Sequence, residues 1–256
     1  MQSSAVILVN FSDNGVVDFI YHTNRQPLWV VSSANHHMVL LLNKPRHWTS
    51  FDVVKKLRAI VGTKKIGHAG TLDPLATGLL LVCTHQETKS ISSYQALDKV
   101  YTGTMVLGKT TPSIDLETDF NSETPYAHIT KMVIQRLAPT FVGPIAQIPP
   151  VYSAIKVGGE RSYQKARRGQ QTVMAPRQVH IHSLIIQAIR LPKIEFEVTC
   201  SKGTYVRSLV RDFGEKLGVG AYLHTLCRTR IGDFKLEDAH DITSLKIRGK
   251  TDANCT

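Results

Sequence analysis

A single carboxylate lies in the most tightly turned stretch of this 256-residue sequence. Residues 66–78 read Ile-Gly-His-Ala-Gly-Thr-Leu-Asp-Pro-Leu-Ala-Thr-Gly, and the apolar run 79–83 follows at once. The three glycines and the proline predict a loop packed on a core strand, with Asp73 as its only acid. Taken alone, the segment favours a turn residue ahead of Pro74. The chemical alternative is an ionised carboxylate that serves as a nucleophile.

A second stretch, residues 200–207, carries the cation that such a nucleophile needs. It reads Cys-Ser-Lys-Gly-Thr-Tyr-Val-Arg. An aspartate that must stay charged in a pocket that excludes water requires a cation held close to it. Arg207 is always protonated and can bond a carboxylate through two donors, so it is the natural partner for Asp73.

Cations also gather in the turn Lys64-Lys65, just before the Asp73 loop, and in residues 147–169, where they alternate with Tyr152 and Tyr163. A single cation of this kind is commonly a solvated turn or surface residue. The mixture suits a single-stranded or looped RNA, because cations contact phosphates and aromatic rings contact bases. The candidates for RNA binding are Lys44, Lys64, Lys65, Lys156, Arg161, Lys165, Arg167 and Arg168.

The overall composition agrees with a polyanionic partner. Lys and Arg outnumber Asp and Glu by 31 to 20, which gives a formal net charge of +11. With 42% hydrophobic and 20% charged residues, the chain is long enough to bury a substantial core, in one large domain or in a domain with a small appendage. No apolar run approaches membrane-spanning length, and the run 5–9 is too short for a secretory signal.

Cysteine and histidine usage points to a reduced, metal-free protein. The four cysteines show neither C-x-x-C spacing nor a dense framework, so we expect reduced thiols and a cytoplasmic location. None of the eleven histidines falls in an H-E-x-x-H motif or a Cys/His cluster. The sequence therefore predicts no metal site.

The elements that must position Asp73 lie on both sides of its loop. Residues 39–42 are typical of a buried strand that ends before Pro45. Ser50 is expected to cap a helix that runs through Val61 and stops at Gly62. Its apolar face, at a spacing of three and four, consists of Phe51, Val54, Leu57, Ile60 and Val61.

The remaining pattern mixes strands with a few helices. Helices are predicted over 86–97 and 127–138, and a third helix follows Arg207 with Leu209, Val210, Phe213 and Leu217 turned inward. This mixture indicates an α+β fold, a mixed sheet with flanking helices. The predicted strands cover 100–107, 178–189, 194–200 and 226–234.

The chain ends look different from its centre. Residues 1–37 contain no Lys and a single Arg, Arg25, and a coherent pattern begins only at Met38. We therefore expect an N-terminal extension over 1–37, with Met38 as an alternative start. The other interpretation is one or two extra edge strands around 5–9 and 29–32. The predicted catalytic domain covers 38–236 with an RNA-gripping insertion at about 140–170, and 237–256 are predicted to form a short tail.

The sequences of the Asp73 loop and of its flanking segments resemble motifs of a known enzyme family. Residues 66–78 are similar to the catalytic motif of the TruB-type tRNA pseudouridine(55) synthases, whose G-(T/A)-L-D-P-x-A-T-G loop carries a nucleophilic aspartate. Residues 43–50 resemble the family's D-K-P-x-G-x-(S/T)-S opening, but Asn43 replaces Asp and His47 replaces Gly. Because His tolerates positive φ less well than Gly, the sequence leaves the loop geometry at His47 open.

Other family motifs extend the resemblance over about residues 38–236. Residues 200–207 match C-S-K-G-T-Y-(I/V)-R, and 98–101 match D-K-x-Y. The loop 109–115 also matches, although the glycine usual a few residues later is missing. Many bacterial relatives carry an extra RNA-binding domain near the C-terminus, and the residues after Phe234 are too few for a full one.

The resemblance implies an isomerase with the pseudouridine synthase fold, which has a central, largely antiparallel sheet with flanking helices. It implies that Asp73 is catalytic and that Arg207 pairs with it. It further implies that the target base is flipped out of its stack and that no cofactor is used. The implied substrate is the T-arm stem-loop of tRNA, and no protein partner or membrane is implied for a chain expected to be a monomer. Among the implied substrate contacts, His68 meets the disrupted RNA loop, Tyr101 stacks on the flipped uracil, and Tyr205 and Leu226 line its pocket.

Alternatives to this function lie inside and outside the enzyme class. A catalytically idle tRNA-binding chaperone on the same scaffold would need no Asp73. Relatives that act on ribosomal RNA have Arg before Leu-Asp, where this chain has Thr71. The archaeal and eukaryotic guide-RNA relatives share the G-T-L-D-P core, but they do not combine it with both the P-L-A-T-G and the Y-S-A-I-K motifs.

Overall fold

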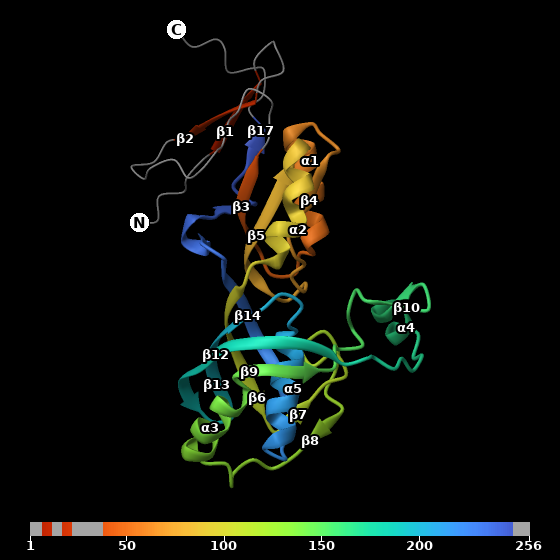
Figure 1. Cartoon of the computed structure of the whole chain (residues 1–256), viewed down its shortest axis with the longest axis vertical. Helices are drawn as coiled ribbons and strands as arrows, with labels where there is room; N and C mark the ends of the chain where they lie inside the picture. Colours follow the sequence, from red (N-terminus) through yellow and green to blue (C-terminus); the bar gives the residue numbers. More distant parts are fainter. Residues whose placement is uncertain (1–6, 12–16, 22–37, 248–256) are drawn as a thin grey trace. The chain divides into compact units, whose positions relative to one another are not determined.

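The structure is a computed structural model that describes residues 7–11, 17–21 and 38–247. It divides into two compact units, one formed by Met1–Ala96 with Arg228–Thr256 and the other by Leu97–Cys227 (Figure 1). The chain passes from the second unit back to the first within strand β14 (Ala221–Ile231), because its residues up to Cys227 belong to the second unit.

The first unit is built on the hydrophobic strand that follows the Asp73 loop. Strand β5 (Thr77–Thr84) pairs antiparallel with β3 (Val39–Lys44) and with the short β4 (Ile66–His68). From Gly78 onward β5 is buried on both faces, as its continuous apolar run predicts. β16 (His240–Asp241) pairs in parallel with β3, and the end of β14 forms a hairpin with β15 (Phe234–Lys235).

Helix α1 (Ser50–Val61) packs alongside this sheet in the first unit (Figure 1). Its N-cap is Thr49 rather than the predicted Ser50, because the Thr49 and Asp52 side chains form a reciprocal capping box. Gly62 ends the helix in the left-handed conformation with φ 70°. The predicted apolar face was wrong for Phe51, which is 59% exposed, since Val53 turns inward in its place.

Residues beyond 236 contribute to the first unit's core. Ile242 and Leu245 are buried in one cluster with Leu42, Val53, Leu57 and other side chains of the first unit. The predicted 86–97 helix is a 3₁₀ turn (His85–Ser90) followed by α2 (Ile91–Ala96). A second 3₁₀ turn covers Leu236–Asp238. The strand expected around 5–9 appears as β1 (Ile7–Phe11), which pairs with β2 (Val17–Tyr21) and β17 (Lys246–Ile247), whereas 29–32 lie outside the described residues.

The second unit is a largely antiparallel sheet in the order β14-β6-β13-β12-β9. Alternating side chains of β13, among them Phe196 and Val198, are fully buried, as the period-2 pattern predicted. Strands β6, β12 and β13 agree with the predicted ones to within one residue at each end, whereas β14 begins five residues earlier than predicted and β9 was not predicted. Their bounds are β6 (Lys99–Leu107), β9 (Gly143–Gln147), β12 (Arg177–Arg190) and β13 (Lys193–Cys200).

Helix α5 (Val206–Lys216) packs on this sheet through the predicted Leu209, Val210, Phe213 and Leu217. The predicted 127–138 helix begins later, as α3 (Lys131–Leu137) capped by Thr130, and continues into a 3₁₀ turn (Ala138–Phe141). The insertion after β9 projects to one side of the second unit (Figure 1). It carries β10 (Lys156–Val157), β11 (Glu160–Arg161) and α4 (Ser162–Arg167), and a small hairpin pairs β7 (Lys109–Thr110) with β8 (Ser122–Glu123).

The described residues agree with the predicted α+β class, with helices flanking largely antiparallel sheets. Cys83, Cys200 and Cys227 are free thiols, and Cys255 lies outside the described residues. Among the helices of the described part, none is long and apolar enough to cross a membrane.

Candidate active site

Asp73 lies on a hairpin loop between β4 and β5. The ladder below the loop pairs His68 with Val82, and Ala69 N donates to Leu81 O at 2.8 Å. Within the loop, Ala76 N donates to Asp73 O at 3.1 Å, which closes a turn around the aspartate. The Asp73 side chain is half-buried, and Leu72 before it is 3% exposed. The predicted turn at Asp73 is therefore confirmed, and the chemical role of Asp73 stays a prediction.

The segment 44–50 fixes the residues on both sides of Asp73. Ser50 Oγ accepts from Leu72 N at 2.9 Å and donates to Leu72 O at 3.3 Å, so one buried hydroxyl satisfies both main-chain groups. His47 N donates to Pro74 O at 2.8 Å. The aspartate is thus held at its N-terminal side by Ser50 and at its C-terminal side by His47.

His47 keeps the backbone conformation that glycine would adopt at this position. Its φ is 68°, in the left-handed region that costs a non-glycine residue about 1–2 kcal/mol. This conformation directs His47 N toward Pro74 O. The loop geometry that the sequence left open at His47 is therefore a left-handed backbone, held in this chain as local strain.

Lys44 is a buried structural cation. It is 0% exposed, and its Nζ donates to Pro45 O at 2.9 Å, Trp48 O at 2.6 Å and Pro74 O at 3.3 Å. Burial lowers the pKa of Lys44 to about 8, with a further contribution from Arg228, while Asp73 opposes the shift. A side chain without solvent access cannot meet a phosphate, so the predicted RNA contact of Lys44 is corrected to a structural role.

Arg228, which is not among the residues predicted from the sequence, holds the other end of the same loop. It is 1% exposed, and its Nε donates to Leu79 O at 2.8 Å while its Nη2 donates to Gly70 O at 3.1 Å. An arginine inside a strand-like run that resembles the family was visible in the sequence, but only its burial identifies it as a structural contact.

The other predicted residues of the first unit differ in exposure. Burial, followed by the charge of Arg228, lowers the pKa of the half-buried His68, so its imidazole is neutral at pH 7. Lys64 and Lys65 are exposed on the turn between α1 and β4. Both lysines are accessible to a phosphate, and their contact with RNA stays a prediction.

In the second unit, Arg207 occupies the first turn of α5 and is 3% exposed. Its Nη1 donates to Ser113 O at 3.0 Å and its Nη2 to Tyr152 O at 2.8 Å. The Asp115 carboxylate lies 3.7 Å from its Nε, and that side chain is 6% exposed. These contacts fix the guanidinium plane. Asp73 belongs to the first unit and Arg207 to the second, so their pairing stays a prediction.

The segment 147–152 fastens the start of α5. Gln147, which is 1% exposed, accepts from Tyr205 N at 2.8 Å. Ile148 O accepts from Ser208 Oγ at 2.8 Å and from Arg211 Nη2 at 3.1 Å. Three predicted substrate contacts lie in this unit with Arg207: Tyr101 on β6, Tyr205 before α5 and Leu226 on β14.

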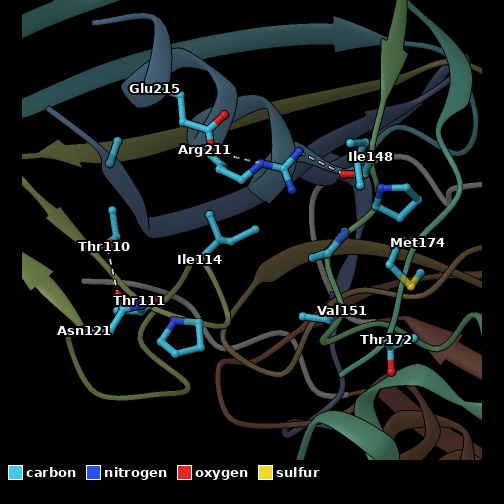
Figure 2. Close-up of a pocket in the computed structure, with 14 residues that line it drawn as sticks. Thr110, Thr111, Ile114, Asn121, Ile148, Val151, Thr172, Met174, Arg211 and Glu215 are labelled. Atoms are coloured by element: carbon cyan, nitrogen blue, oxygen red, sulfur yellow. Dashed lines mark hydrogen bonds and ion pairs between the residues drawn. The ribbon is translucent and has the colours of Figure 1, made fainter. Parts of the chain in front are cut away.

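A cavity of about 360 Å³ opens beside α5, one turn beyond Arg207 (Figure 2). Its lining combines apolar groups such as Ile114 and Met174 with Arg211 and Glu215, which lie 3.8 Å apart. Thr172 Oγ1, also in the lining, is buried without a hydrogen-bond partner. No pattern in the sequence indicates this cavity, because its walls come from segments far apart in the chain.

The predicted cations of the insertion differ in their solvent exposure and in their ion pairs. Lys156 and Arg161 are exposed. Arg167 Nη2 lies 2.6 Å from Glu117 Oε1 outside the insertion, and its guanidinium lies 5.4 Å from the Tyr163 ring centre. Arg168 pairs with Glu160 inside the insertion, and Lys165 is half-buried. Among the described residues, no group of three or more His, Cys, Asp or Glu side chains is arranged to hold a metal ion.

Comparison with known proteins places this geometry in a class. A solved structure of a Cbf5-Nop10-Gar1 complex contains a chain that matches with a TM-score of 0.60 and 29% identity, over 77% of this chain and 49% of that one. A structure of an H/ACA RNP bound to a substrate RNA matches with a TM-score of 0.59 and 26% identity, over 80% of this chain and 51% of that one. The chain thus spans about half the length of these solved chains. Both share the pseudouridine synthase fold.

Sequence relatives narrow the class to a family. The model of the TruB family pseudouridylate synthase N-terminal domain matches residues 58–206, and that of the tRNA pseudouridylate synthase B C-terminal domain matches 207–252. A protein of Flavobacterium johnsoniae named tRNA pseudouridine synthase B is 49% identical over 80% of this chain and 93% of its own length. A protein of Bacteroides fragilis with the same name is 48% identical over 79% and 90%. The chain belongs to the TruB family of pseudouridylate synthases.

Proposed function

We propose that this protein is an isomerase that converts uridine to pseudouridine at position 55 in the T-loop of tRNA, with Asp73 as its nucleophile. The observation that carries the proposal is the immobilised loop of Asp73. Side chains or main-chain groups of 44–50 bind the residues before and after it, so the carboxylate is held by its scaffold. The relatives at 48–49% identity are named for this reaction on tRNA.

The reaction requires a nucleophile and no redox step. The bond from the ribose C1′ to the uracil N1 breaks, the base turns, and a bond from C1′ to C5 forms, while C5 loses a proton and N1 gains one. A carboxylate can attack the sugar carbon or the base, or assist elimination from the sugar, and each route needs it ionised. Neither the sugar carbon nor the ring is accessible in a stacked base, so base flipping follows.

Arg207 is proposed as the cation that stabilises the ionised Asp73. Its contacts with Ser113 O, Tyr152 O and Asp115 orient the guanidinium before substrate arrives. A preorganised cation costs no reorganisation at the moment of reaction, which makes it effective in a site that excludes water. The nearby Asp115 carboxylate shares the charge of Arg207, and two acids around one arginine tune how strongly it binds either one.

The remaining residues are proposed to hold the flipped nucleoside and the RNA around it. Tyr101 stacks on the uracil, its hydroxyl is a candidate acceptor for the C5 proton, and Tyr205 and Leu226 line the pocket. His68, neutral at pH 7, contacts the disrupted RNA loop. The RNA phosphates are bound by Lys64, Lys65, Lys156, Arg161, Lys165, Arg167 and Arg168. We place the protein in the cytoplasm as a monomer, because its substrate would be there and the reaction needs no second protein.

The test compares Asp73→Asn with wild type on a T-arm stem-loop. Wild type is expected to form pseudouridine at the T-loop uridine, and Asp73→Asn is expected to bind the RNA without product. Asp119→Asn changes an exposed acid of the second unit and should retain the wild-type rate. Product from Asp73→Asn would overturn the nucleophile. Tight binding by a wild-type protein that forms no product would favour the idle chaperone instead.

A further inference from the structure

Arg228 is a buried cation whose hydrogen bonds in the described part of the chain go to main-chain carbonyls. The side chain is 1% exposed, and its two acceptors are Leu79 O at 2.8 Å and Gly70 O at 3.1 Å. Burying a guanidinium is expensive unless its donors are satisfied. A protein that needed only to fill this space would use an apolar side chain, so the arginine has a specific task.

The two carbonyls stand on opposite ends of the Asp73 loop. Gly70 lies three residues before the aspartate, and Leu79 lies six residues after it, at the start of the buried apolar run. The Nε and Nη2 groups of one planar guanidinium therefore bridge the two arms of the hairpin at its neck. Ser50 and His47 hold the tip of the loop near Asp73.

The backbone of β14 also packs directly on this neck. A Cβ atom added to Gly78 would lie 2.4 Å from Arg228 O and 2.7 Å from Arg228 N. Such contacts are shorter than any side chain tolerates, so glycine at 78 permits the close approach of the two strands. Gly78 has φ 104°, which an L side chain rarely adopts. Gly78 and Arg228 together define one joint between β14 and the loop.

We propose that Arg228 is a positioning residue for the isomerisation, acting through the main chain of the Asp73 loop. It fixes the distance between the loop's two arms and thereby sets where the Asp73 carboxylate points. This inference rests on the proposed function of Asp73. A displacement of about 1 Å in a reacting group can cost about 100-fold in rate, so a loose neck weakens catalysis even in a folded protein.

The experiment exploits the difference between arginine and lysine. Arg228→Lys keeps a buried positive charge but has a single compact ammonium group, which cannot bridge carbonyls on two arms as a planar fork does. Arg228→Met removes both charge and donors while keeping much of the volume. The matched controls are Arg230→Lys and Arg230→Met, because Arg230 lies two residues further along the same strand and is exposed.

Each variant is assayed under single-turnover conditions with saturating T-arm stem-loop, well below its own unfolding midpoint. We expect the rate of Arg228→Lys to fall about 10- to 100-fold, with the dissociation constant for the RNA within about 2-fold of wild type. Amide hydrogen exchange should rise in residues 70–79 while α1 and β3 stay protected. The Arg230 variants should keep the wild-type rate and exchange.

Two results would overturn the positioning role. A wild-type rate in folded Arg228→Lys would show that charge alone is sufficient. A rate loss with unchanged exchange in 70–79 would show that Arg228 acts elsewhere. If Arg228→Met does not fold, the Lys variant alone decides. Absence of product from wild type and from the Arg230 controls would instead reject the proposed function of the enzyme.

Discussion

The Asp73 loop of the first unit and the insertion of the second unit are held in opposite ways. Around Asp73, buried side chains bind the main chain itself, through Ser50 at the tip and Arg228 at the neck. Helix α4 of the insertion carries Arg167, whose ion pair with Glu117 outside the insertion is exposed to solvent. Buried hydrogen bonds are costly to break, whereas exposed ion pairs contribute about 0–1 kcal/mol.

This difference separates the residues that position the proposed nucleophile from the residues proposed to bind RNA. The carboxylate proposed to react stands on a scaffold whose flanking main-chain groups are satisfied before any substrate binds, as preorganised catalysis requires. The cations proposed to bind RNA stand on a projecting element whose contacts can be exchanged for phosphates at little cost. Arg207 belongs to the first type, because it is buried and bound to two carbonyls. Variants on the two sides should therefore fail differently.

The largest effect is expected from Arg207→Lys. Lysine keeps the charge but loses the fixed fork that contacts Ser113 O and Tyr152 O, so the cation proposed to stabilise Asp73 would be misplaced. We expect the single-turnover rate to fall about 100-fold or more with RNA affinity within about 3-fold. Arg211→Lys, one turn further along α5, is the matched control. A rate within 2-fold of wild type for Arg207→Lys would remove Arg207 from the proposed site.

Ser50→Ala should have the next largest effect. It strands the buried Leu72 N and Leu72 O, which costs about 1–3 kcal/mol in the free energy of unfolding. Because Leu72 precedes Asp73, the rate should also fall about 10-fold at unchanged RNA affinity. Thr49→Ala, the adjacent cap variant, should lose about 1 kcal/mol of stability and no rate in the folded protein. Equal rates for both variants would contradict the positioning of Asp73 by Ser50.

Lys44→Met tests whether the buried Lys44 makes the free energy of unfolding depend on pH. The pKa of Lys44 is about 8 in the folded protein and 10.5 in an unperturbed lysine. Between these values the unfolded chain binds more protons, so the free energy of unfolding rises with pH, by at most about 1.4 kcal/mol per pH unit. Below pH 8 both states are protonated and the slope vanishes. Urea unfolding from pH 7 to 10 should show this rise in wild type but not in Lys44→Met, and matching slopes would contradict the burial of a charged Lys44.

How far the sequence predicted this structure depends on the distance over which each residue acts. The strands of the second unit and the buried face of α5 follow from local periodicity, and the α+β class follows from them. Phe51 was misplaced because the apolar pattern of α1 allows either Phe51 or Val53 on the buried face, and only the packed sheet selects Val53. Asp73 was identified from the sequence motif in residues 66–78.

Arg228 and the burial of Lys44 were missed for the opposite reason. Each is decided by carbonyls that the fold brings near, and a basic side chain in a sequence looks the same whether it meets phosphate or main chain. Lys44 precedes Pro45 at the end of a strand, where exposure is the ordinary expectation. A side chain that binds the main chain of a distant segment can therefore be identified only from the structure.

Arg167→Ala should have the smallest effect, and its pattern would complete the comparison. The side chain is 60% exposed in its pair with Glu117, so its loss should change the free energy of unfolding by less than about 1 kcal/mol. If Arg167 binds a phosphate, the dissociation constant for the T-arm should rise a few-fold at low salt, with a smaller difference at high salt. The rate at saturating RNA should stay within 2-fold of wild type. Glu117→Gln, which frees Arg167 from its partner, should leave RNA binding equal or tighter. A rate loss without an affinity loss in Arg167→Ala would place the insertion in the same class as the Asp73 loop.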